Sequence, residues 1–150
     1  MEKNPGAEKR SVAGIAVKGN KLFIVRRGAG GDLGGKWEFP GGKAEEGESD
    51  EAALEREYRE ELGVRAGVGP LLASSFFAHN GMNFSLNAYR VSFDEKDVRL
   101  SEHTEWRWAG LEDIRNLDFA DSDRKLLDPL EAELEKQARV QQGKAGARLA

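Results

Sequence analysis

The sequence predicts an α+β fold in which helices lie beside a mixed, mostly antiparallel sheet. Short apolar runs flank two dipeptides that favour tight turns, Gly19-Asn20 and Asn80-Gly81, as expected for β-hairpins. A segment with both a start and a stop signal for a helix lies between these hairpins, and a further helical segment follows residue 121. Hairpins and helices in separate stretches of one chain are typical of the α+β class.

The first hairpin is predicted to join Ser11 to Lys18 with Lys21 to Arg27, because both runs are short and apolar. The loop that follows, Gly28 to Gly35, contains five glycines. Such a loop can follow the shape of a bound substrate, since glycine adopts conformations that other residues avoid. The same glycines are equally compatible with a flexible connecting loop that binds nothing.

A helix is predicted to begin near Ser49, a favoured N-cap residue, and to stop at Gly63, a usual C-terminal residue of helices. Residues at a spacing of four predict its buried stripe: Leu54, Tyr58 and Leu62. The tyrosine ring suits an apolar pocket if its hydroxyl reaches water or a partner.

The second half of the chain predicts a second hairpin, one further strand and two helices. The hairpin joins Ser74 to His79 with Met82 to Phe93, whose side chains alternate between apolar and polar. The further strand covers Trp106 to Ala109. The helices cover Asp121 to Leu127 and a segment through Leu134 to about Val140.

The length of 150 residues suits one domain with a substantial core. We expect residues 11–141 to form it. Residues 1–10 and 142–150 are expected to be flexible ends, because they are polar or mix glycine, alanine and basic residues.

Composition narrows the partners and the chemistry. A net charge of −4 and a pI near 5.4 argue against a nucleic-acid surface, which normally presents a basic face. The absence of cysteine excludes disulfides and thiol catalysis. No apolar run is long enough to span a bilayer, and the polar start lacks the apolar core of a signal peptide, so we expect a cytoplasmic protein without a membrane partner. The sequence leaves a homodimer open.

Three carboxylates crowd one side of the predicted helix. Glu57 is three residues from Glu60 and four from Glu61, and Glu60 and Glu61 are adjacent. Their charges therefore repel one another. Clustered oxygen donors suit a hard divalent ion, and Mg²⁺ is usually held by one or two carboxylates together with waters and substrate phosphates. Two of them, Glu57 and Glu61, flank the buried stripe, where burial raises carboxylate pKa values. The segment therefore predicts a metal-dependent phosphate site, against the plainer alternative of a solvated acidic face.

This stretch resembles the Nudix box, a pattern of glycine, glutamates and arginine at fixed spacing. The matching positions are Gly42, Glu48, Arg56, Glu57, Tyr58, Arg59, Glu60, Glu61, Leu62, Gly63 and Val64. Tyr58 departs from the pattern, since the family usually has an aliphatic residue there. The resemblance is greatest to the mutator-type (MutT-like) nucleoside triphosphate pyrophosphohydrolases, and it implies an α/β/α sandwich.

The resemblance also implies roles for individual residues. The catalytic set would be Arg56, Glu57, Glu60 and Glu102, with Glu105 as a rival to Glu102. The ligands of Mg²⁺, or of Mn²⁺ as a substitute, would be Gly42, Glu57, Glu60 and Glu61. Glu48 would form an ion pair with Arg56 that holds the loop against the helix, with a free surface pair as the alternative. Gly41 would let the backbone approach a ligand closely, with a plain turn as the alternative.

Substrate binding is assigned to four residues: Arg27, Glu38, Phe39 and Asp123. Residues 36–43 resemble the corresponding stretch of the MutT-like enzymes, and Asp123 stands where those enzymes carry a base-contacting Asn or Asp. Arginine suits a phosphate, although a solvated strand end is a comparable alternative for Arg27. His79 and His103 are expected to be ordinary surface histidines.

The resemblance implies Mg²⁺-dependent hydrolysis of a nucleoside triphosphate, canonical or oxidised, to the monophosphate and pyrophosphate. The base stays open. Two alternatives are a hydrolase of nucleoside diphosphate sugars or dinucleotides, and a Nudix-fold module that binds a nucleotide without cleaving it. The complete set of carboxylates favours an enzyme.

Overall fold

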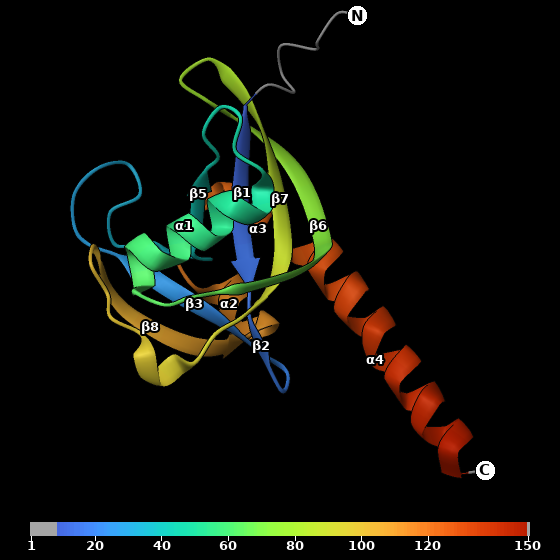
Figure 1. The fold of residues 1–150 in the computed structure, drawn as a ribbon. Helices are drawn as coiled ribbons and strands as arrows, with labels where there is room; N and C mark the ends of the chain where they lie inside the picture. Colours follow the sequence, from blue (N-terminus) through green and yellow to red (C-terminus); the bar gives the residue numbers. More distant parts are fainter. Residues whose placement is uncertain (1–8, 150) are drawn as a thin grey trace, which may run out of the picture.

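The computed structural model describes residues 9–149, with side chains placed through residue 143, and it confirms the α+β class (Figure 1). The elements follow one another as β1 (Arg10–Ile15), β2 (Val17–Lys18), β3 (Lys21–Arg27), β4 (Trp37–Glu38), β5 (Gly41–Lys43), α1 (Asp50–Leu62), β6 (Gly67–His79), β7 (Met82–Ser92), a 3-10 turn (Glu95–Asp97), β8 (His103–Gly110), α2 (Leu111–Asn116), α3 (Asp121–Arg124) and α4 (Leu127–Leu149). Most of the predicted N-terminal segment lies outside the described residues.

The strands form two sheets rather than one. The first has the order β5-β1-β7-β6, with β1 parallel to β7 and its other pairs antiparallel. In the second, β3 pairs antiparallel with β2, β4 and β8. The strand predicted from Ser11 to Lys18 is divided at Ala16, so its first part joins one sheet and its last part joins the other. The Gly19-Asn20 hairpin therefore connects β2 with β3.

The core lies on both faces of the central strands, which produces three layers. Val12 on β1 packs into a cluster with Leu54 of α1, whereas its neighbour Ala13 packs into a second cluster with Ile114 of α2 and Leu130 of α4. Successive residues of a strand point to opposite faces, so one strand supplies both clusters. α1 covers one side and α2 and α3 the other (Figure 1), as expected for an α/β/α sandwich.

The predicted helix signals are confirmed in α1. The Ser49 hydroxyl accepts a hydrogen bond from the Ala52 N–H at 3.1 Å, which caps the first turn. Gly63 ends the helix with a φ of 66°, in the left-handed region that glycine tolerates. The predicted stripe is fully buried.

Tyr58 fills its pocket differently from the expectation. Its hydroxyl is buried and has no hydrogen-bond partner among the described residues. The ring instead occupies the space beside Gly14 on β1, where an added Cβ would stand 2.1 Å from the hydroxyl oxygen and 2.5 Å from two ring carbons. Glycine at position 14 is therefore a packing requirement of this tyrosine.

The C-terminal helices differ from the prediction in their bounds. The segment expected as one helix from Asp121 to Leu127 divides into α3 and the start of α4. α4 then continues past Val140 to Leu149 and extends away from the sheets (Figure 1). The flexibility expected of the chain ends stays a prediction. Among residues 9–149, no helix combines the length and apolarity that a membrane span needs.

Candidate active site

The predicted site residues come from separate elements that the two sheets bring together. They are Arg27 on β3, Glu38 on β4, Phe39 in the following turn, Gly41 and Gly42 on β5, Glu48 in the loop before α1, Arg56 and the three glutamates of α1, Glu102 before β8, and Asp123 on α3. The antiparallel pairing of β5 with β1 sets the two glycines beside α1, which packs on the same strands. The pairing of β3 with β4 and β8 sets Arg27 next to this region.

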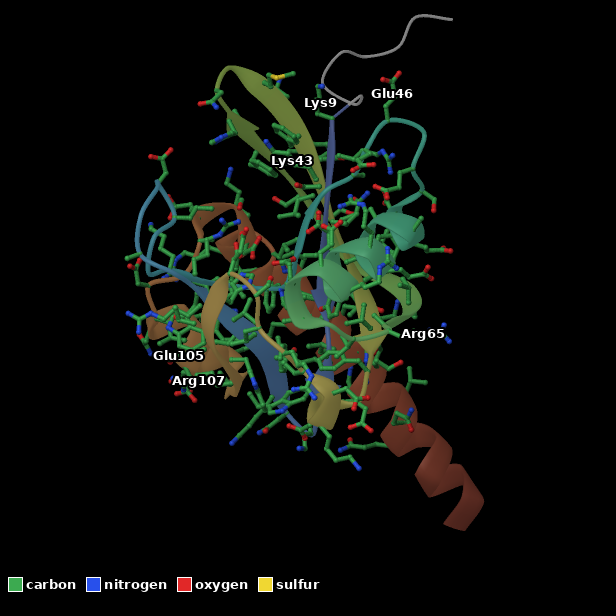
Figure 2. All side chains as sticks on the ribbon, turned by 60° about the vertical axis from the view of Figure 1, so that its left-hand side comes forward. Lys9, Lys43, Glu46, Arg65, Glu105 and Arg107 are labelled. Carbon is green, nitrogen blue, oxygen red and sulfur yellow. The ribbon has the colours of Figure 1, made fainter. Side chains whose placement is uncertain are left out.

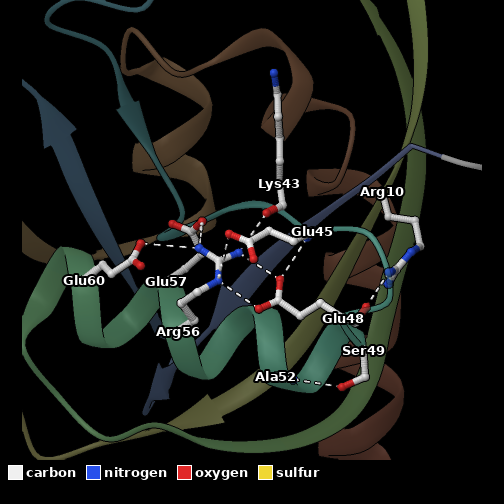
Figure 3. A network of polar contacts seen from close by, with 9 residues as sticks. All are labelled: Arg10, Lys43, Glu45, Glu48, Ser49, Ala52, Arg56, Glu57 and Glu60. Carbon is white, nitrogen blue, oxygen red and sulfur yellow. Dashed lines mark hydrogen bonds and ion pairs between the residues drawn. The ribbon is translucent and has the colours of Figure 1, made fainter.

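Arg56 ties α1 to the loop that precedes it (Figure 3). Its Nε donates to Glu48 Oε2 at 2.8 Å and its Nη2 donates to Glu48 Oε1 at 2.9 Å. Nη2 also donates to the carbonyl of Lys43, and Nη1 donates to Glu57 Oε1 at 3.0 Å. The Arg56 hydrogen bonds, aided by the Glu45 N–H, lower the pKa of Glu48 to about 2. The predicted ion pair is thus present, while its support of catalysis stays a prediction.

Glu57 and Glu61 are largely buried, with side chains 15% and 16% exposed. The Glu57 carboxyl group lies against Gly42, where an added Cβ would stand 2.7 Å from it. Glu61 Oε1 accepts a hydrogen bond from the Gly41 N–H at 3.0 Å. Burial raises the pKa of Glu57. Burial and then the charges of Glu38 and Glu57 raise the pKa of Glu61 to about 9.

Glu102 and its rival Glu105 lie in different surroundings. Glu102 is exposed and lines a small cavity of about 240 Å³ together with Glu61. Glu105 lies on the outer side of β8 (Figure 2), and its carboxylate is 3.5 Å from Arg26 Nη1. Of the two, Glu102 is therefore the one that shares a cavity with a buried carboxylate.

A buried histidine joins the cluster, so the expectation of a surface side chain at position 103 was wrong. His103 Nε2 lies 2.9 Å from Glu38 Oε2 and 3.5 Å from Glu61 Oε2. Glu38 Oε2 also accepts a hydrogen bond from Arg27 Nε at 3.0 Å. The register of β3 and β8 sets His103 opposite Arg27, and local sequence offers no signal for this beyond a histidine at a strand start. His79 is exposed, as expected.

A cavity of about 590 Å³ adjoins these groups and is lined by the four predicted substrate residues. This volume is typical of small-molecule sites. Asp123 lies buried on α3, within the segment predicted to be helical, and its Oδ2 accepts a hydrogen bond from the Phe39 N–H at 2.9 Å. Burial and then the charge of Glu38 raise the pKa of Asp123 to about 7.

The buried carboxylates fit a divalent metal ion. Glu38, Glu61 and His103 each offer a ligand atom, and these atoms lie within 4.8 Å of one another. Within the described part of the chain, Glu61 has no lysine or arginine nitrogen within 4.0 Å, and its contact with a basic side chain is His103 Nε2 at 3.5 Å. Glu60 is 57% exposed, and its Oε2 lies 3.4 Å from Arg56 Nη1 on the same helix. A mostly oxygen donor set of this kind suits a hard cation.

The chain resembles known proteins in both sequence and structure. A model of the NUDIX domain matches residues 8–130. The CTP pyrophosphohydrolase of Escherichia coli (strain K12) is 37% identical over 117 residues, which cover 78% of this chain and 87% of that protein. The 8-oxo-dGTP diphosphatase of Proteus vulgaris is 50% identical over 50 residues, 33% of this chain and 45% of that protein. The crystal structure of a MutT protein from Methanosarcina mazei Go1 matches with a TM-score of 0.73 and 26% identity, covering 83% of this chain and 93% of that one.

Proposed function

This chain belongs to the Nudix family and is a Nudix hydrolase, and we propose that it cleaves a nucleoside triphosphate to the monophosphate and pyrophosphate with Mg²⁺. One observation carries the proposal: the buried carboxylates of Glu57 and Glu61 adjoin a nucleotide-sized cavity through the Gly41-Gly42 backbone. A cation site and a cavity that share one wall bring phosphates and metal ligands together, as phosphoryl transfer requires.

The proposed ligands are Glu57, Glu60 and Glu61 with the backbone of Gly42. A bound Mg²⁺, or Mn²⁺ in its place, would neutralise charge on the phosphate oxygens. The hydrogen bond from Arg56 orients the Glu57 carboxylate. Fixed ligands of this kind need no rearrangement during the reaction.

The other groups act on the substrate itself. The half-exposed guanidinium of Arg27 lines the cavity and suits a phosphate oxygen. A carboxylate takes the proton of the attacking water while the water oxygen bonds to phosphorus. The candidates for this carboxylate are Glu57, Glu60 and Glu102. The phosphoanhydride P–O bond breaks in the same displacement, and pyrophosphate leaves.

Asp123 and Phe39 support a nucleobase in the same cavity. A carboxyl group with a pKa near 7 can accept or donate a hydrogen bond, so it can pair with the exocyclic and ring groups of several bases. Two relatives are named for CTP and for 8-oxo-dGTP, which carry a pyrimidine and an oxidised purine. Both kinds of triphosphate are therefore substrates to test first.

The test is a substrate panel with Mg²⁺ that contains canonical and oxidised nucleoside triphosphates, nucleoside diphosphate sugars and dinucleoside polyphosphates. We expect triphosphates to give monophosphate and pyrophosphate, measured by chromatography and a pyrophosphate assay. Hydrolysis confined to the sugar or dinucleotide substrates would replace the proposal with the alternative hydrolase. Binding without any product would indicate the non-catalytic module.

A matched pair of variants on α1 links activity to the buried carboxylates. Glu61→Gln is expected to lower kcat/KM more than tenfold, which is a barrier increase above roughly 1.4 kcal/mol. Glu55→Gln changes an exposed glutamate of the same helix and should leave the rate unchanged. Equal rates for the two variants would remove Glu61 from the metal site.

Two further expectations about the protein stay predictions. The cytoplasmic location expected from the sequence is tested by cell fractionation. A homodimer is tested by light scattering on a size-exclusion column.

A further inference from the structure

The imidazole of His103 bridges two carboxylates that arrive from different elements. Nε2 lies 2.9 Å from Glu38 on β4 and 3.5 Å from Glu61 on α1, and the histidine side chain is only 5% exposed. A buried nitrogen between two carboxylate oxygens either donates a hydrogen bond to them or shares a metal ion with them. The environment of the second ring nitrogen decides between these two roles.

Nδ1 of His103 is buried and has no hydrogen-bond partner among the described residues. A histidine that binds a metal through Nε2 carries its proton on Nδ1 and almost always donates it to a carboxylate, carbonyl or water. Here that N–H would be buried without an acceptor, which is unfavourable. A neutral ring with the proton on Nε2 places its N–H between the two carboxylates, so the contacts favour this tautomer.

We propose that His103 is a positioning residue whose Nε2–H holds Glu38 and Glu61 in the geometry that metal binding needs. Nε2–H is donated to Glu38 Oε2, while Glu61 accepts the Gly41 N–H on Oε1 and its Oε2 faces His103 Nε2 at 3.5 Å. Glu38 is likewise shared by Arg27 and His103. The inference rests on the proposed function, because it assigns His103 to the support of a ligand of that reaction.

Holding a ligand from a second element limits its rotation before the ion arrives. Residues that orient metal ligands in this way typically change metal affinity or activity by 10- to 100-fold when they are replaced. The opposite role, His103 as a ligand, would make the site favour metals with an affinity for imidazole over Mg²⁺. The two roles differ in what a glutamine at this position would do.

The experiment compares His103→Gln, His103→Leu and His103→Asn with the wild type. Glutamine places an amide N–H near the position of Nε2 but offers no imidazole. Leucine has no donor, and asparagine carries its amide on a shorter side chain that falls short of the carboxylates. Mn²⁺ affinity is measured without nucleotide by the electron paramagnetic resonance signal of free Mn²⁺, and circular dichroism confirms folding.

We expect His103→Gln to keep Mn²⁺ affinity within about threefold of the wild type, and His103→Leu to weaken it about 10- to 100-fold. His103→Asn should weaken Mn²⁺ affinity as His103→Leu does, and it replaces His103→Leu in the comparison if the leucine variant does not fold. In His103→Leu, the metal concentration that gives half of the maximal activity should therefore rise. The KM for nucleotide, measured separately at saturating metal, should change less.

Two results would overturn the role. Equal losses of Mn²⁺ affinity in His103→Gln and His103→Leu would make His103 a ligand. Unchanged Mn²⁺ affinity in folded His103→Leu and His103→Asn would leave His103 outside the site. Failure of the wild type itself to bind Mn²⁺ would instead overturn the proposed function on which this inference rests.

Discussion

Arg56 and Glu48 meet through two parallel hydrogen bonds, so that both carboxylate oxygens are held by one guanidinium (Figure 3). The same guanidinium also donates to the Lys43 carbonyl and to Glu57. A planar group with five donors can satisfy all these acceptors together, whereas an ammonium ion cannot. Arg56 therefore connects the loop, β5 and a proposed metal ligand through one side chain.

Arg56→Lys is expected to lower kcat about tenfold or more, because it keeps the charge but loses the fork that orients Glu57. Steady-state kinetics with saturating Mg²⁺ measures this. Arg59→Lys provides the matched control, since Arg59 is exposed on the same helix. If both variants retain wild-type kcat, the orienting role is wrong.

The metal-free protein should lose stability as pH rises, because the pKa of Glu61 increases on folding from 4.5 to about 9. Below about pH 4.5 the carboxyl group is protonated in both states, and at higher pH only the folded protein keeps this proton. The folded state then binds more protons than the unfolded state, so the free energy of unfolding falls as pH rises toward about 9. Thermal melts in a chelator should show a steeper fall for the wild type than for Glu61→Gln.

Adding Mg²⁺ should flatten this pH dependence, since a bound cation replaces the proton and stabilises the native state by mass action. Glu55→Gln should follow the wild type at every pH. Parallel curves for wild type and Glu61→Gln would show that Glu61 titrates normally.

Asp123→Asn should change base preference and leave the fold intact. The amide oxygen can still accept the Phe39 N–H, so the melting temperature should stay near that of the wild type. Loss of a charge-assisted contact is worth roughly 1.5–3 kcal/mol, so ratios of kcat/KM between nucleotides should shift by about 10- to 100-fold. Asp113→Asn, on the exposed side of α2, is the control. Unchanged ratios would limit Asp123 to holding the turn at Phe39.

Tyr58→Phe is expected to stabilise the protein by about 1–3 kcal/mol, because it removes a buried hydroxyl without a partner. Denaturant unfolding measures the change. Gly14→Ala tests the same contact in the opposite direction, since its Cβ would overlap the ring. Overpacking of this kind destabilises by about 1–3 kcal/mol. If Gly14→Ala left the free energy of unfolding unchanged, the Tyr58 ring would have to move freely in its pocket.

The features of α1 could be predicted from sequence because they depend on residues close together in the chain. The Ser49 cap and the Gly63 stop act within one helical turn, and the spacing of Leu54, Tyr58 and Leu62 follows from the helical repeat. The ion pair of Arg56 with Glu48 spans only eight residues. The hairpin turns are local for the same reason.

The surroundings of the proposed active site depended on contacts between distant segments. His103 meets Glu38 across 65 residues, and Asp123 meets the Phe39 N–H across 84 residues. Strand register decides which side chains face each other, and a one-residue slip would reverse every side chain of the strand. Local sequence therefore supplied the acidic helix, while the pairing of β3 with β8 and the burial of Asp123 on α3 decided which partners surround its carboxylates.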